Sequence, residues 1–357
     1  GVAGPIGFAD GIAAQARFNG ILGIAADAMG NVYVADSANH AIRRITPSGI
    51  VSTIAGNVGA PESGDIDGLG NVARFNYPTG IAVTPDGRVI YVADSGNHKI
   101  KRISISTWAD PTNPENWTVS TIAGTGTAGK DDGTGNVATF NEPYGVAVDL
   151  WGNVYVTERA GNRVRRLQFK GGEPDLPTNW QVSLVAGDNS ASAGASGDTD
   201  GQGSSARFNA PCGIAVDHAG NLYVADSGNH RIRKIVNALG GFGGTVSTLA
   251  GSTQGYSDGT GTSAQFNTPK GIAVDTAGYL YIADTGNNRI RRVSPTGVVM
   301  TIAGSGTAGN VDGVGNVARF NGPSALAVDA SGNLYVVDGA NGELVRLIQR
   351  IINVGSP

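Results

Sequence analysis

One position in this chain carries side chains that could do chemistry, and their types differ each time the position recurs. Each of these residues precedes a glycine or alanine and then a short apolar run. A constant frame around a changing residue is how a binding site is placed on a repetitive scaffold. We therefore expect these side chains to contact a ligand, and in chain order they are Leu22, Thr79, Tyr144, Cys212, Lys270 and Ser324.

Four residues could serve a catalytic site: Tyr144, Arg159, Cys212 and Lys270. A nearby cation such as Lys270 would favour the thiolate of Cys212, which is the form that attacks a substrate. A lone cysteine is more often a small buried hydrophobic residue, and no histidine recurs on a neighbouring strand to act as its base. No Gly-x-Ser-x-Gly elbow, His-Glu-x-x-His helix or phosphate loop occurs. The sequence therefore argues against an enzyme.

Two sets of repeated residues could bind metal ions. His40, His98 and His230 share one repeat position, and neutral imidazole is a common metal ligand. Equivalent positions in separate repeats of a ring lie far apart, so we interpret these histidines as structural or surface residues. Aspartates that precede glycine also recur, but an aspartate commonly opens a turn before glycine. We predict no metal site and no cofactor from either set.

A six-fold repeat organises the chain and must position these residues. The tetrapeptide Ala-Arg-Phe-Asn, or a close variant, recurs, and an Asp-Gly pair stands eight residues before every phenylalanine. Self-similarity at a fixed period is the signature of repeat architectures. The units account for the whole chain, so we predict one domain over residues 1–357, marked by Phe18, Phe75, Phe140, Phe208, Phe266 and Phe320.

Each unit is predicted to form four short strands. In the fourth unit these are residues 213–217, 221–226, 230–235 and 245–251, with alternating apolar residues and turn signals between them. Four strands in such a repeat indicate a propeller blade. The predicted fold is therefore an all-β, six-bladed β-propeller of antiparallel blades around a central channel, which could hold a divalent ion. Residues 2–4 could supply the last strand of blade six, and residues 351–354 compete for that role.

Tryptophans are predicted to gather on one face of the ring. We call the face with the loops between second and third strands the top, and the opposite face the bottom. Trp108 and Trp117 fall in a bottom loop of blade two, and Trp151 and Trp180 fall at the bottom of blade three. Trp117 and Trp180 directly precede strands and should pack between them. Trp108 and Trp151 should be partly exposed, which makes them candidate binding residues.

The heptapeptide Asp-Ser-Gly-Asn-His-Arg-Ile that begins at Asp226 resembles the NHL repeat. The Ala-Arg-Phe-Asn tetrapeptide preceded by Asp-Gly makes the chain most similar to bacterial, often exported, NHL proteins. This resemblance implies a six-bladed propeller but no particular function. In the related peptidyl-hydroxyglycine amidating lyases, the variable position holds zinc-binding histidines, and none is present here. Arg159 does stand where those lyases have an arginine. Close copies of the heptapeptide begin at Asp36, Asp94 and Asp284, and looser ones at Glu158 and Asp338.

Composition and charge limit the possible partners. The net charge is −4, and most of the 25 lysines and arginines recur in third strands, where we expect them to pair with the repeated aspartates as surface charge. We therefore predict no nucleic-acid binding, and the lack of a long apolar run predicts no membrane insertion. The favoured function is a non-enzymatic propeller that binds a protein, peptide or glycan. We expect it to be extracellular or at the cell surface, with the periplasm as an option, and monomeric or part of a longer surface protein. The alternative is a metal-assisted lyase or hydrolase at the top of the channel.

Overall fold

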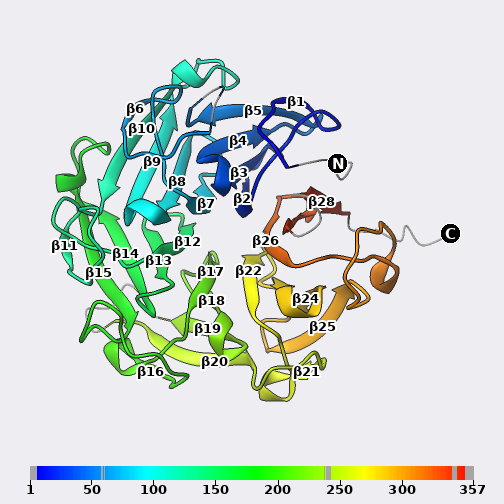
Figure 1. Ribbon diagram of the computed structural model, residues 1–357. Helices are drawn as coiled ribbons and strands as arrows, with labels where there is room; N and C mark the ends of the chain where they lie inside the picture. The colour runs from blue at the N-terminus through cyan, green and yellow to red at the C-terminus, as the bar shows by residue number, and fades with distance from the viewer. Residues whose placement is uncertain are drawn as a thin grey trace.

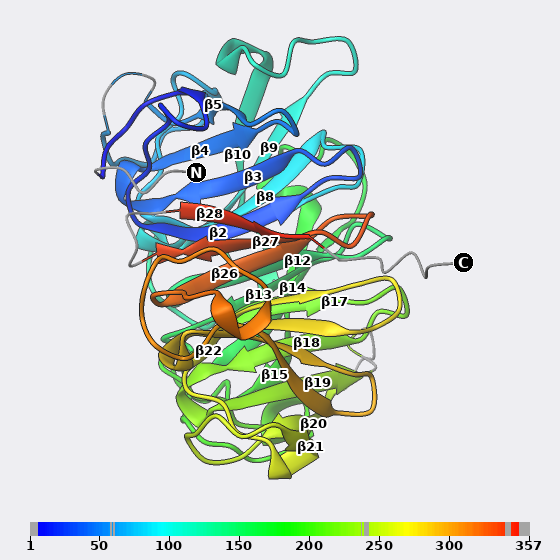
Figure 2. The same cartoon turned by 90° about the vertical axis from the view of Figure 1, so that its right-hand side faces the viewer.

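The computed structural model describes residues 6–57, 59, 61–236, 238, 243–339 and 344–349. Within them, the regular elements are β-strands and single-turn 3₁₀ helices. The strands form six antiparallel sheets arranged as blades around a central channel, which confirms the predicted six-bladed β-propeller (Figure 1). In the side view, the same blades stack around the ring with their strands crossing its thickness (Figure 2).

The inner strand of each blade lines the channel, and the later strands follow outward. Blade one contains β2 (Ile21–Ala26), β3 (Val32–Asp36), β4 (Ala41–Ile45), β5 (Ile50–Ala55) and β1 (Gly11–Ile12). Blade two contains β7 (Pro78–Val83), β8 (Val89–Asp94), β9 (Lys99–Ile105), β10 (Trp117–Ala123) and β6 (Gly68–Leu69). Blade three contains β12 (Pro143–Val148), β13 (Val154–Glu158), β14 (Arg163–Phe169), β15 (Trp180–Gly187) and β11 (Gly133–Thr134).

The other three blades repeat this order. Blade four contains β17 (Pro211–Val216), β18 (Leu222–Asp226), β19 (Arg231–Val236), β20 (Thr245–Gly251) and β16 (Gly201–Gln202). Blade five contains β22 (Pro269–Val274), β23 (Leu280–Asp284), β24 (Arg289–Val293), β25 (Val298–Ala303) and β21 (Gly259–Thr260). Blade six contains β26 (Pro323–Val328), β27 (Leu334–Asp338) and β28 (Leu344–Ile348). The 3₁₀ helices are η1 (Ser37–Asn39), η2 (Ser95–Asn97), η3 (Pro114–Asn116), η4 (Pro177–Asn179), η5 (Gly203–Ser205), η6 (Ser227–Asn229), η7 (Gly261–Ser263), η8 (Thr285–Asn287) and η9 (Gly315–Val317).

Five blades have five strands, so the expectation of four was one strand short. The additional strand is only two residues long, and it comes from the Asp-Gly segment at the outer edge. In blade one, the carboxylate of Asp10 accepts a hydrogen bond from the backbone N–H of Thr53 at 2.9 Å. This bond holds β1 along β5. In blade six, residues 2–4 and 351–354, the two candidates for the closing strand, lie outside the described residues.

Blade six packs directly on blade one, which closes the inner part of the ring. Ile21 and Ile24 of β2 belong to the same buried cluster as Ala325 and Ala327 of β26. Comparable clusters fill each of the other spaces between neighbouring blades. The fold is therefore stabilised by apolar side chains buried between blades, because each sheet covers its neighbour's face.

Each blade also buries a cation between two carboxylates. Arg43 donates to Asp10 at 2.6 Å and to Asp36 at 2.7 Å, and its guanidinium lies 5.0 Å from the ring centre of Phe18. The predicted pairing of repeated cations with repeated aspartates is thus confirmed, but their surface location was wrong at this position. The cations buried here are Arg43, Lys101, Arg165, Arg233, Arg291 and Arg346. They are buried because the Asp-Gly segment folds over them from the outer edge.

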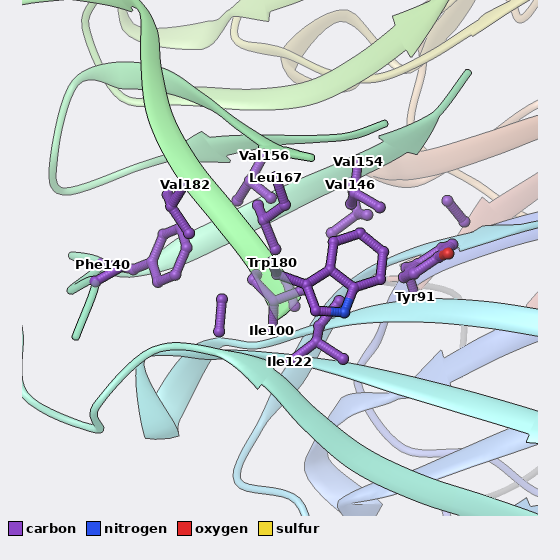
Figure 3. Close-up of a cluster of buried hydrophobic side chains, with 14 residues drawn as sticks. Tyr91, Ile100, Ile122, Phe140, Val146, Val154, Val156, Leu167, Trp180 and Val182 are labelled. Atoms are coloured by element: carbon purple, nitrogen blue, oxygen red, sulfur yellow. The ribbon is translucent and has the colours of Figure 1, made fainter. Parts of the chain in front are cut away.

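Trp117 and Trp180 are core residues, as predicted. Trp180 is almost fully buried between blades two and three, in the cluster shown in Figure 3. Its ring meets Tyr91 edge-on with the centroids 6.0 Å apart, and its indole N–H donates to the carbonyl of Pro174 at 2.8 Å. Trp117 makes the same kind of contact with Tyr33 one blade earlier. The long loops that lead into β10 and β15 therefore contribute to packing between blades through these residues.

Candidate functional site at the top of the channel

A cavity of about 290 Å³ opens at the top of the channel, and it brings together residues from five blades. Five of the six predicted positions line it, together with Arg159. The sixth, Ser324, lines the adjoining channel cavity, which also includes Leu22, Tyr144 and Lys270. We call the residues around these two openings the channel mouth. The lining of the upper cavity is Leu22, Tyr77, Thr79, Ser95, Glu142, Tyr144, Arg159, Ala210, Cys212, Ser227, Gly228, Thr268 and Lys270.

The backbone explains why the variable residues point into the mouth. The pairing of β12 with β13 is regular up to Val146 and shifts between Val146 and Pro143, so Tyr144 lies at a β-bulge. Bulges re-aim side chains at sheet ends. The glycine that follows is also required, since a Cβ on Gly145 would lie 2.3 Å from the carbonyl oxygen of Cys212. Glycine thus lets the inner strands approach closely and narrows the channel beneath the mouth.

Arg159 forms an ion pair in the mouth. Its guanidinium donates to the carboxylate of Glu142 at 2.9 Å and lies 5.7 Å from the ring centre of Tyr144. The arginine is about half exposed, so the pair faces solvent at the cavity edge. Burial, together with the neighbouring Cys212 thiol, raises the pKa of Tyr144. Tyr144 is therefore a neutral aromatic wall and a hydroxyl donor in this site.

Cys212 is unsuited to nucleophilic attack. Its side chain is 2% exposed, and its thiol lies 3.5 Å from the carbonyl oxygen of Ala210. Burial raises the pKa of the Cys212 thiol, and the charges of Arg159 and Lys270 offset only part of that rise. The raised pKa disfavours activation of the thiol by Lys270, because desolvation outweighs the cation. The interpretation of Cys212 as a small buried hydrophobic residue agrees with this geometry.

Other predicted residues hold the mouth together. Thr79 is buried, and its hydroxyl donates to the carbonyl of Tyr144 at 2.9 Å, which fastens blade two to blade three. Lys270 is partly exposed on β22 and lines both cavities. Leu22 supplies apolar surface to the same two cavities. The mouth therefore combines aromatic and apolar walls with charged donors.

Sequence reasoning missed Tyr77 and Glu142. Both lie two residues before a predicted position, in the left-handed region of backbone space, with φ of 53° and 54°. Because the preceding loop turns there, their side chains reach the cavity from outside the strand. This second position also varies between repeats, as Gly20, Tyr77, Glu142, Ala210, Thr268 and Gly322. That variation was the signal that could have identified them.

The recurring histidines have a structural role, as predicted. His40, His98 and His230 end 3₁₀ turns in the left-handed conformation. Each Nδ1 accepts a hydrogen bond from a backbone N–H in the next blade. Throughout the described part of the chain, His, Cys, Asp and Glu side chains nowhere gather in the groups of three that could hold a metal ion.

Trp108 and Trp151 are exposed, as predicted, with 95% and 63% of their surface accessible. Trp108 lies in the loop between β9 and β10, and Trp151 lies in the turn between β12 and β13. A Cβ on Gly220 would lie 3.4 Å from the Trp151 ring, so this ring rests against the corresponding turn of blade four. The two tryptophans belong to separate bottom loops, away from the channel mouth.

Comparison with known proteins agrees with the repeat geometry. The model of the NHL repeat matches residues 18–45 and 75–103, and the model of the teneurin NHL domain matches residues 138–259 and 248–311. The chain carries NHL repeats. Its relatives include NHL repeat-containing protein 2 of Homo sapiens, 31% identical over 79% of this chain and 40% of that protein. Protein SUPPRESSOR OF QUENCHING 1, chloroplastic, of Arabidopsis thaliana is 31% identical over 82% of this chain and 26% of that protein.

Solved structures share the fold of this NHL propeller. A protein of unknown function from Bacteroides thetaiotaomicron aligns with a TM-score of 0.69 and 21% identity, over 97% of this chain and 73% of that one. An auxiliary nutrient binding protein from the same organism aligns with a TM-score of 0.65 and 17% identity, over 96% and 72%. The chain spans less than half the length of the two curated relatives above. In the described residues, no helix is long and apolar enough to cross a membrane.

Proposed function

We propose that this NHL propeller is a non-enzymatic binding protein that holds a protein, peptide or glycan partner at its channel mouth, in an extracellular or cell-surface setting. The observation that carries the proposal is the convergence of non-repeated side chains on one cavity. Five of the positions that differ between blades, with Arg159, line a single opening of about 290 Å³. Residues that repeat serve the ring, whereas these residues differ at equivalent places.

The chemistry of the mouth supports recognition. Tyr77, Tyr144 and Leu22 offer flat and apolar surface, while Arg159 and Lys270 offer charged donors. Ligand sites combine such walls with a few polar groups that fix orientation. The thiol of Cys212 is buried with a raised pKa, and Arg159 is already paired with Glu142. A binding role requires no change in the protonation of the thiol or in the pairing of the arginine. The same fold occurs in an auxiliary nutrient binding protein, which is consistent with a binding role.

A metal-assisted lyase or hydrolase at the same mouth is the second candidate. It is favoured by the presence of Glu142, Tyr144 and Arg159 in one cavity, since carboxylate, phenol and guanidinium groups serve many eliminations and hydrolyses. Elemental analysis of protein purified without chelators or an affinity metal separates the two candidates. One equivalent of zinc, calcium or iron, with chemical change of a bound ligand by mass spectrometry, would favour the enzyme.

The test of the binding proposal is a screen of glycan and peptide arrays with the whole chain, followed by titration of the best binder. We expect Tyr144→Ala to weaken binding at least tenfold, about 1.4 kcal/mol, by removing the aromatic wall. The matched control is Trp108→Ala with Trp151→Ala on the bottom face, which should bind as the parent does. The opposite result would move the binding site to the bottom face, and thermal melting of each variant checks that it is folded.

A further inference from the structure

Two donors without partners among the described residues lie on neighbouring inner strands of the channel mouth. Lys270 on β22 and Ser324 on β26 occupy the same repeat position, and both line the channel cavity. Ser324 is 9% exposed, and its buried hydroxyl has no hydrogen-bond partner. A buried hydroxyl without a partner costs free energy, so this group would gain by donating to a bound molecule.

Lys270 is the cation in the mouth that lacks a counter-charge among the described residues. Three of the side chains that line the upper cavity are charged at neutral pH: Arg159, Lys270 and Glu142. Glu142 pairs with Arg159 at 2.9 Å and so neutralises it. The positive charge of Lys270 is left over, in a partly enclosed space where charge interactions are stronger than in water.

Three carbonyl oxygens in or beside the mouth already accept a hydrogen bond. The hydroxyl of Thr79 donates to the carbonyl of Tyr144, and the hydroxyls of Ser227 and Thr285 donate to the carbonyls of Pro269 and Pro323. Each bond takes up one of the two lone pairs of a carbonyl that a cationic ligand would otherwise contact. The mouth therefore offers donors more readily than acceptors, which matches a negatively charged ligand group.

We propose that the ligand carries an anionic group, a carboxylate or a phosphate, which the Lys270 ammonium and the Ser324 hydroxyl hold together. This inference rests on the proposed function of the mouth and adds the chemistry of its ligand. Both donors line the channel cavity of about 70 Å³, so the anionic group would lie there. The upper cavity of about 290 Å³, which Lys270 also lines, is at the small end of ligand pockets and would accommodate the rest of one monosaccharide or one amino-acid residue. The walls formed by Tyr77 and Tyr144 would contact the uncharged part of that unit.

The experiment is isothermal titration of the whole chain with matched probe pairs. D-Glucuronate is compared with D-glucose, and N-acetyl-L-tyrosine with N-acetyl-L-tyrosinamide, each up to about 10 mM so that weak binding registers. Inorganic phosphate is the fifth probe. We expect at least one anion to bind about tenfold or more tightly than its neutral counterpart, since a charge-assisted bond is lost in the neutral probe. The preferred anion identifies the source of the charged group.

Four variants complete the test. Lys270→Gln should weaken binding of the preferred anion at least about tenfold, and Lys270→Arg should retain it within about threefold because the charge is kept. Ser324→Ala should weaken it about threefold to tenfold through loss of one donor. Lys170→Gln is the matched control, since Lys170 is an exposed lysine at the bottom of blade three. The melting temperature of each variant verifies folding.

Equal binding of charged and neutral probes, unchanged by Lys270→Gln, would overturn the anionic-ligand inference. Failure of all five probes to bind would overturn it as well. Neither result contradicts the proposed function. That proposal fails only if binding of every partner found on the arrays is unchanged by Tyr144→Ala. The two proposals can therefore be refuted separately.

Discussion

The imidazole Nδ1 of His40 accepts a hydrogen bond from the backbone N–H of Tyr77 at 3.0 Å, and this bond joins blade one to blade two. His230 does the same for Thr268 at 3.0 Å. In blade three the corresponding acceptor is the side-chain oxygen of Asn162, which receives the N–H of Ala210 at 2.8 Å. A histidine and an asparagine thus serve one structural purpose, but only the histidine can titrate near neutral pH.

The use of histidine rather than asparagine in these blades predicts that the stability of the fold is sensitive to acid. Burial lowers the pKa of His40 and of His230 in the folded protein. The fold therefore favours the neutral ring, whose contribution is present above the ordinary pKa near ~6.5 and is lost as the pH falls through the folded pKa. A protonated ring carries a hydrogen on Nδ1 and cannot accept the bond. Between pH 7 and 5 we expect a loss of about 0.5 kcal/mol per histidine, discounted for solvent screening.

The double variant His40→Asn with His230→Asn should be less sensitive to acid. Asparagine accepts the same bond at every pH, as Asn162 does in blade three. Urea unfolding of the parent and the variant at several pH values measures the difference. If the two proteins lose the same stability between pH 7 and 5, the histidines do not act as this geometry requires.

Blade two has the one lysine among the six cations buried at the repeat position of Arg43, and this predicts a stabilising substitution. Burial raises the pKa of Asp94 to about 7, and the neighbouring Lys101 offsets only part of that effect. The Lys101 ammonium pairs instead with Asp67 at 2.7 Å and with Asp65 at 3.0 Å. In blade one, the wider guanidinium of Arg43 reaches both carboxylates. Lys101→Arg should therefore supply the missing bond to Asp94 and stabilise the fold by about 1 kcal/mol near pH 7.

The pH dependence of this effect has a definite sign. A carboxyl whose folded pKa is raised contributes stability below its unfolded pKa near ~3.9 and loses it as the pH rises through about 7. The advantage of Lys101→Arg should accordingly grow from pH 4 to pH 7. Arg291→Lys in blade five is the reverse control and should destabilise, because Arg291 holds Asp258 and Asp284 together. Chemical denaturation between pH 4 and pH 7 measures the difference in stability between Lys101→Arg and the parent. A difference that does not change with pH would contradict the prediction.

The sequence predicted the blades and the positions at the channel mouth better than it predicted the outer edge of each blade. The recurring frame placed Tyr144, Lys270 and their equivalents at the channel mouth, since a repeated register fixes the end of each inner strand. The outer strand at Gly11 was missed because two residues carry no periodic pattern. The burial of Arg43 was also missed, because alternation in a third strand predicts an exposed face. The covering Asp10 lies 33 residues away in the sequence, so only the folded blade brings the two together.

The tryptophans divide into two classes whose truncation should have opposite results. Trp117 and Trp180 fill the spaces between blades, so Trp→Ala at either should cost about 3–5 kcal/mol. Trp108 and Trp151 are exposed, so each change to alanine should alter the free energy of unfolding by less than about 0.5 kcal/mol, also when the two are combined. Thermal and chemical unfolding measure both. A large loss from the exposed pair would mean that these rings are part of the core.

The glycine below the channel mouth gives the sharpest test of how the inner strands are packed. A Cβ on Gly145 would lie 2.3 Å from the carbonyl oxygen of Cys212 and 2.8 Å from the hydroxyl of Thr157. The backbone cannot yield without separating blades three and four, so Gly145→Ala should destabilise by about 2 kcal/mol or more. Blade six already has Ala325 at this position, and Ala325→Gly should cost only about 0.5–1 kcal/mol. Equal losses in the two variants would mean that close approach is not what glycine provides there, and the mouth would then be free to widen around a ligand.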